Sequence, residues 1–164
     1  MSAKKLSMIL LTIGLASVAI MMAMTSKAGP GHGHDAKPKA DGLSIANAYI
    51  AGMEAGDLDA LSELFIADEK STILENASNE GSWEFYSDHH LKPELEVVKD
   101  FKFEIAEQSQ RTFGDTILVE QTGTFSVNVQ DETHNYRVAV SYLLVTEKGQ
   151  LKIAHLHWSS RPQS

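Results

Sequence analysis

The second half of the chain constrains the fold most, because from Lys99 onward apolar residues recur at every second position. A period of two places alternate side chains on one face of a β-strand. The longest run predicts a strand whose buried face carries Ile117, Val119, Gln121, Gly123, Phe125, Val127 and Val129. Shorter runs predict strands around residues 101–105, 136–146 and 151–160, with turns at 114–115, 131–135 and 148–149. Gly123, in the middle of a strand, predicts a bulge or bend there.

Residues 41–98 carry helical patterns instead. Asp41 is a suitable N-cap for a first helix, whose apolar stripe consists of Leu43, Ala46, Tyr49, Ile50 and Met53. A second helix is expected after Gly56, a short strand over Ser71–Leu74 and a polar loop over Asn76–Gly81. Ser82 is placed to cap a third helix, and Pro93 fits the first turn of its continuation.

Helices followed by a meander of long strands predict an α+β domain, in which the helices cover one face of a curved antiparallel sheet. A bent sheet roofed by helices leaves a concave pocket, where sites for small ligands are usually found.

The N-terminal segment predicts export. Lys4 and Lys5 precede an apolar run over Leu6–Met24, and Ser26-Lys27-Ala28 offers small residues at both positions of a signal peptidase site. We therefore expect a signal peptide over 1–28, a flexible linker over 29–41 and a domain over 42–162, in the periplasm or outside the cell. An uncleaved membrane anchor is the alternative. In the linker, His32, His34 and Asp35 are either loose metal ligands or part of a solvated tether.

Composition excludes some partners. If Lys4, Lys5 and Lys27 are removed with the signal, 11 of the 14 basic residues remain against 22 acidic ones, which gives a net charge near −11 with neutral histidines. Nucleic acids and anionic membrane surfaces require a cationic patch, so neither is expected as a partner. The chain has no cysteine. No disulfide can form, and an exported domain of this kind must be held by its core alone.

Histidines supply the candidate binding residues. His155 and His157 are two residues apart on the last predicted strand and are expected on one face with Leu151, Ile153 and Ser159. His90 follows Trp83 by seven residues and Tyr86 by four, so it shares their helical stripe, whereas His89 follows Phe85 and faces elsewhere. The predicted ligand-binding pocket therefore contains Glu75, Trp83, Tyr86, His89, His90, His155 and His157.

Two kinds of chemistry fit this histidine set. One is a divalent metal site, zinc or copper, with His90 (or His89), His155 and His157 as ligands and Glu75 as a fourth. Without a metal, the same histidines are polar pocket groups hydrogen-bonded to Glu75, Ser159 and one another. The other is acid–base catalysis on a small organic molecule, with Asp88, Glu75 or Glu120 orienting a histidine. The chain has no cysteine nucleophile, glycine-rich phosphate loop or GxSxG turn.

Three segments carry a family resemblance. They are the helical opening over Ala46–Phe65, the segment from Ile73 to Leu91, which contains Trp83-Glu84-Phe85-Tyr86, and the last strand over Leu151–Arg161. In these segments the chain resembles the nuclear transport factor 2 (NTF2)-like superfamily, in its exported SnoaL-like branch. The resemblance spans residues 42–162. It implies a cone-shaped α+β domain that is usually a homodimer through its sheet.

The superfamily includes ketosteroid isomerases, polyketide cyclases, dehydratases and non-catalytic association domains. The resemblance thus implies an exported small-ligand-binding domain, with an isomerase or cyclase and a dimeric association module as alternatives. The isomerases pair an acidic base with a tyrosine and a protonated carboxyl group. Tyr86 and Asp88 are present here, but their spacing does not reproduce that motif.

Overall fold

The structure is a computed structural model that describes residues 41–67 and 70–163. The chain divides into two units, residues 1–36 and 37–164, and the described residues all belong to the second. The predicted signal peptide and nearly all of the predicted linker lie outside the described residues. Within the described part, no helix is both long enough and apolar enough to cross a membrane.

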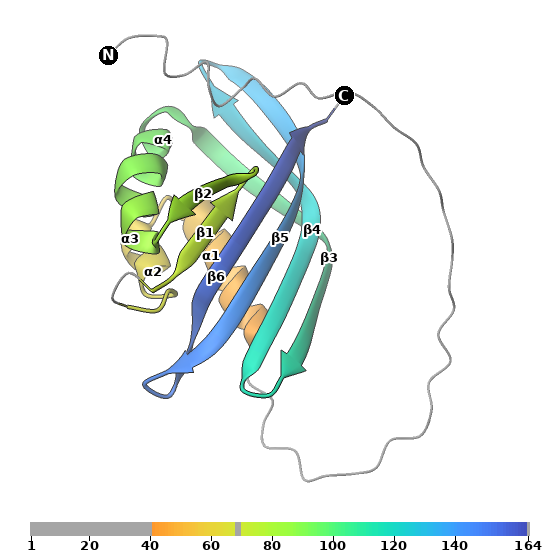
Figure 1. Ribbon diagram of the computed structural model, residues 1–164. Coiled ribbons are helices and arrows are strands. Elements are labelled where there is room, and N and C mark those ends of the chain that lie inside the picture. Colours follow the sequence, from red (N-terminus) through yellow and green to blue (C-terminus); the bar gives the residue numbers. More distant parts are fainter. Residues whose placement is uncertain (1–40, 68–69, 164) are drawn as a thin grey trace, which may run out of the picture. The chain divides into compact units, whose positions relative to one another are not determined.

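The described residues form a six-stranded sheet with helices at one face and one edge (Figure 1). The strands are β1 (Thr72–Glu75), β2 (Ser78–Gly81), β3 (Lys99–Phe113), β4 (Thr116–Val129), β5 (Glu132–Glu147) and β6 (Gln150–Pro162), in the sheet order β2-β1-β6-β5-β4-β3. β1 pairs with β6 in parallel, and the other pairs are antiparallel. The helices are α1 (Gly42–Ala55), α2 (Leu58–Ser62), α3 (Trp83–Tyr86), the π-helical turn η2 (Ser87–Leu91) and α4 (Lys92–Val97). This arrangement confirms the predicted α+β class.

Local signals account for the helix bounds. The carboxylate of Asp41 accepts a hydrogen bond from the Ser44 amide at 3.3 Å, and Gly56 ends α1 in the left-handed conformation. Ala46, Tyr49 and Ile50 are buried, which confirms the predicted apolar stripe. This stripe packs α1 onto β3, β4 and β6, so it covers the face of the sheet that we call the inner face.

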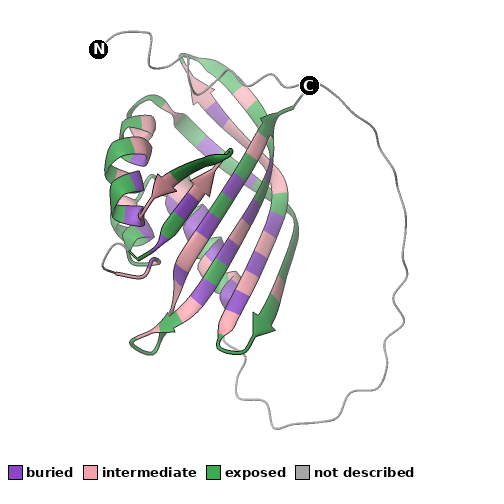
Figure 2. Ribbon diagram, in the orientation of Figure 1, coloured by how far each residue is buried: buried purple, intermediate pink, exposed green. Residues whose placement is uncertain are grey.

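Alternation along the long strands places the core on that inner face (Figure 2). On β4, Ile117, Val119, Gln121 and Val127 are buried, as predicted. The bulge expected near Gly123 is confirmed: the β3–β4 register shifts between Ile105 and Glu107, opposite this glycine. A Cβ added at Gly123 would lie 2.1 Å from the carbonyl oxygen of Glu104, so only glycine allows the two backbones to approach this closely.

The predicted polar loop over Asn76–Gly81 is wrong in part. Residues 78–81 form β2, joined to β1 by a tight turn in which Asn76 and Ala77 have φ values of 45° and 73°. Two positive φ angles give a turn whose twist matches that of a hairpin. The sequence gives no signal for this strand, because Ser78-Asn79-Glu80-Gly81 has no apolar alternation and Ala77 is an unusual residue for such a turn.

A second bulge lies in β6 and reverses a prediction. Leu144 pairs with Ile153, but Leu143 pairs with His155, so Ala154 is an extra residue. An extra residue exchanges the two faces of the strand beyond it. Leu156 and Trp158 are therefore 1% and 7% exposed in the core. His155 and His157 point to the opposite, outer face instead of sharing a face with Ile153.

Candidate functional site

Short helical elements beside β1 and β2 position the candidate site. Ser82 caps α3 by accepting a hydrogen bond from the amide of Phe85 at 3.3 Å, and Pro93 lies at the start of α4, as predicted. Between them the chain makes the π-helical turn η2, an element often associated with functional sites. Along this stretch, the rings of Tyr86 and His90 lie 5.0 Å apart. The shared stripe predicted for these two residues is thus formed.

Glu75 reaches the same place from the end of β1. It pairs in register with Trp158 of β6, so both side chains project from the inner face. The hydroxyl of Tyr86 donates a hydrogen bond to Oε2 of Glu75 at 2.9 Å. The side chain of Glu75 is 18% exposed and therefore remains within reach of a ligand.

His90 lies among three carboxylates. Its Nδ1 atom is 3.2 Å from Oε2 of Glu80, and its Nε2 atom is 3.8 Å from oxygens of both Glu75 and Glu94. The His90 side chain is 26% exposed. We call Glu75, Glu80, Tyr86, His90 and Glu94 the carboxylate–histidine cluster.

The charges of this cluster perturb its own ionisation. The contact with Glu94 and the negative charge of Glu75 raise the pKa of His90 to about 9, against the opposing effect of burial. His90 is therefore an imidazolium at neutral pH. Burial, together with the charges of Glu94 and Glu80, raises the pKa of Glu75, although His90 and Tyr86 pull it down. Burial and the charge of Glu75 also raise the pKa of the Tyr86 hydroxyl, which stays a hydrogen-bond donor.

Aromatic rings of the inner face lie next to the cluster. We call Phe101, Phe103, Phe125, Tyr136 and Trp158 the aromatic wall. Its ring contacts are close: the centroids of Phe125 and Tyr136, for example, are 4.7 Å apart and stacked. Burial and the charge of Glu94 raise the pKa of Tyr136, and Glu75 pairs with Trp158. Phe101, Phe103 and Trp158 are buried, whereas Phe125 and Tyr136 are partly exposed, so the wall presents its partly exposed rings beside ionisable groups.

The other predicted pocket residues have different roles. Trp83 is 3% exposed, stacks on Phe65 at 4.3 Å and donates from Nε1 to the hydroxyl of Ser62 at 2.9 Å, so it closes the core. His89 is exposed and stacks on Phe85 at 4.2 Å, away from His90.

The structure does not assemble the predicted three-histidine metal site. His90 belongs to the cluster, whereas the Ala154 bulge turns His155 and His157 to the outer face of the sheet. Within residues 41–67 and 70–163, no group of three or more His, Asp or Glu side chains is arranged to hold a metal ion. Burial and the neighbouring His157 lower the pKa of His155.

Comparison with known proteins agrees with the fold. A family model described as a SnoaL-like domain matches residues 43–162. The chain belongs to this family. No curated protein sequence matches it. The predicted membership of the NTF2-like superfamily is confirmed.

Solved structures share the fold of this SnoaL-like domain at low sequence identity. An NTF2-like superfamily protein from Salmonella enterica serovar Typhimurium is 13% identical, with a TM-score of 0.66 over 74% of this chain and 89% of that one. A putative scytalone dehydratase from Novosphingobium aromaticivorans is 11% identical, with a TM-score of 0.63 over 74% and 81%. A putative ketosteroid isomerase from Shewanella frigidimarina is 18% identical, with a TM-score of 0.60 over 71% and 92%.

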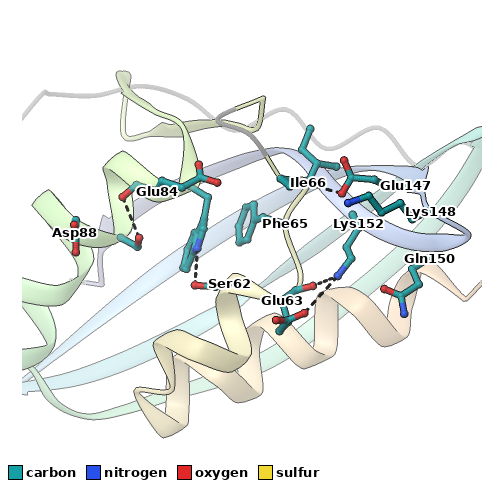
Figure 3. A pocket seen from close by; sticks show the side chains of 13 residues that line it. Ser62, Glu63, Phe65, Ile66, Glu84, Asp88, Glu147, Lys148, Gln150 and Lys152 are labelled. Carbon is teal, nitrogen blue, oxygen red and sulfur yellow. Dashed lines mark hydrogen bonds and ion pairs between the residues drawn. The ribbon is translucent and has the colours of Figure 1, made fainter.

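A separate pocket of about 520 Å³ lies on this SnoaL-like domain (Figure 3). It shares no residue with the cluster or the aromatic wall. Its charged lining is mixed in sign, with Lys148 and Lys152 among four acidic side chains, and Lys152 is held by the backbone carbonyl of Glu63. Its mixed charge favours no single class of ligand.

Sequence reasoning missed Glu80 and Glu94. Glu94 follows His90 by four residues, so helical spacing could have placed it in the site. Glu80 depends on the β1–β2 hairpin, which had no sequence signal. Two other proposed carboxylates lie elsewhere: Asp88 is 72% exposed beside Lys92, and Glu120 pairs with Arg111.

Proposed function

We propose that this SnoaL-like domain binds a small, flat organic molecule between the aromatic wall and the carboxylate–histidine cluster, and that Glu75 exchanges a proton with it. The observation that carries the proposal is the position of Glu75. Its carboxyl group is largely buried and has a raised pKa. It accepts a hydrogen bond from Tyr86, and Glu75 pairs with Trp158 across β1 and β6. A raised pKa keeps more of this carboxyl in the protonated form than in an exposed glutamate, which suits proton exchange near neutral pH.

The neighbours of Glu75 supply the remaining functions. The aromatic wall offers apolar contact to a flat ring. His90, protonated below about pH 9, holds a positive charge beside Glu75 and stabilises its ionised form after it has lost a proton. Tyr86 fixes the Glu75 carboxyl through its hydrogen bond and keeps it directed along the inner face.

Structural neighbours support a reaction of this type. Two of them are described as a putative ketosteroid isomerase and a putative scytalone dehydratase. In this chain, the carboxyl, tyrosine and histidine groups of the carboxylate–histidine cluster would carry acid–base chemistry. A metal is not required, since the cluster contains both a proton carrier and a fixed positive charge.

2-Naphthol tests the proposal, because it is flat and aromatic, carries one hydroxyl group and fluoresces differently when that group is ionised. The wild-type protein is expected to bind it with the hydroxyl directed to Glu75. Glu75→Gln should weaken binding about tenfold, because a charge-assisted hydrogen bond is replaced by a neutral one. Fluorescence titration measures both the affinity and the ionisation of the bound naphthol.

Glu84→Gln is the matched control. Glu84 is an exposed residue of α3 that lines the separate pocket and does not belong to the cluster. This variant should bind naphthol as the wild type does. Equal affinity in the wild type and Glu75→Gln, or loss of binding in Glu84→Gln alone, would place the ligand outside the cluster and overturn the proposal.

A further inference from the structure

The outer face of the sheet carries two histidines that the proposed ligand site does not use. His155 and His157 follow the Ala154 bulge on β6 and project from the same side of the strand. The buried residues between and beyond them, Leu156 and Trp158, project to the core. His157 is exposed and His155 is partly buried, so both rings can be reached from solvent.

The neighbouring strand fixes one of the two rings. Thr72 of β1 lies directly beside His155 in the parallel β1–β6 pairing, and its hydroxyl oxygen is 2.6 Å from Nδ1 of His155. When Nδ1 carries the proton and donates it to Thr72, the lone pair of Nε2 is free for a metal ion. Metal-binding histidines regularly have a second partner of this kind, which sets the tautomer and the ring orientation.

No charged side chain pairs in register with either histidine. The side chains that pair in register with the two histidines are those of Thr72, Leu74, Ser141 and Leu143. Ser141 of β5, which pairs with His157, pairs on its other side with Glu120 of β4. Glu120 carries the nearest carboxylate in this direction across the outer face, and it is paired with Arg111. The two imidazoles are thus the side chains on this stretch of β6 that are able to bind a metal ion.

We propose that His155 and His157 form a two-nitrogen chelate for a borderline divalent ion on the outer face of the sheet, with water completing the coordination. Imidazole nitrogens favour copper, nickel and zinc, and Cu²⁺ binds most strongly in this series. The site is independent of His90 and lies on the opposite face from the carboxylate–histidine cluster.

Copper titration of the full chain tests the chelate. His32 and His34 could bind copper as well, so the parent protein for the test is the full chain with His32→Ala and His34→Ala. This parent should bind one Cu²⁺ per chain, measured by isothermal titration calorimetry. His157→Ala should lower the copper affinity at least tenfold, because one donor cannot chelate, and Thr72→Val should lower it several-fold, whereas Thr72→Ser should retain it.

His89→Ala is the control, because His89 is an exposed histidine outside the chelate. It should leave copper binding unchanged. Equal copper affinity in the parent and in His157→Ala would overturn the chelate, as would an equal loss in His89→Ala. Circular dichroism confirms that each variant is folded, and the naphthol affinity should be the same in His157→Ala and the parent, which separates this site from the proposed ligand site.

Discussion

At the scale of single residues, His90 is the centre of the site because carboxylates from three different elements converge on it. Glu75 ends β1, Glu80 belongs to β2 and Glu94 to α4. Three partly buried carboxylates would repel one another, and the imidazolium lowers that cost. The proton on His90 is therefore part of the folded structure as well as of the proposed chemistry.

This coupling predicts a pH-dependent stability. The pKa of His90 is raised from 6.5 to about 9 on folding, so its contribution is fully present below pH 6.5 and is lost as the pH rises through 9. The raised pKa of Glu75 acts in the same direction at lower pH, since the folded state holds that proton more tightly than the unfolded state. The free energy of unfolding should fall by about 2 kcal/mol between pH 6.5 and 9, after allowance for partial exposure.

Urea unfolding at these two pH values measures the change. His90→Gln should remove most of the difference, because glutamine does not titrate. His89→Gln, which alters an exposed neighbour, should keep it. A wild-type stability that is constant or rises over this interval would contradict the assignment of the proton to His90.

Part of the site was predictable from spacing alone. Tyr86 and His90 are four residues apart on a helical segment, and their stripe was predicted correctly. Glu75 was identified as a candidate, although its partner Glu80 depends on a hairpin that the sequence does not signal. His155 and His157 were assigned to the wrong face because the bulge at Ala154 contains no glycine that would have indicated a bulge in the sequence.

At the scale of elements, helices and strands with strong apolar periodicity were predicted reliably, whereas irregularities such as bulges and the π-helical turn were not all predicted. The stripe of α1 and the alternation of β4 follow from burial of one face, which the apolar pattern encodes directly. The bulge opposite Gly123 had a signal because backbone contact there requires glycine. The π-helical turn over Ser87–Leu91 had no such signal in the sequence.

Gly123→Ala tests the β3–β4 bulge. The added methyl group would meet the backbone carbonyl of Glu104, so one of the two strands must move. We expect a loss of about 2–4 kcal/mol in the free energy of unfolding. Thermal or urea unfolding measures the loss.

Thr122→Ala is a neighbouring control, since Thr122 is exposed and its change should cost less than about 0.5 kcal/mol. If Gly123→Ala were as stable as this control, the close approach of the two backbones would not exist in solution.

At the scale of the whole molecule, the sheet separates the two proposed sites. The inner face carries the aromatic wall and the carboxylate–histidine cluster, and the outer face carries the His155–His157 pair. Variants of one site should therefore leave the other unchanged, because residues on opposite faces share no partners.

Export is also a prediction for the whole chain. When the chain is produced in a bacterium, cleavage after Ala28 should release a mature protein that begins at Gly29, because residues 26–28 supply the small side chains that signal peptidase reads. Mass spectrometry of the secreted or periplasmic fraction measures the N-terminus. A full-length protein that remains in the membrane fraction would identify residues 6–24 as an anchor.

The most direct test of the central claim is an NMR titration of the histidine side chains in the folded protein. Convergence of Glu75, Glu80 and Glu94 on one imidazole predicts a pKa of about 9 for His90, whereas burial and the nearby His157 predict a pKa below 6.5 for His155. A pKa of His90 near its ordinary value of 6.5 would show that the carboxylates do not surround it, and it would contradict both the cluster and the function proposed for it.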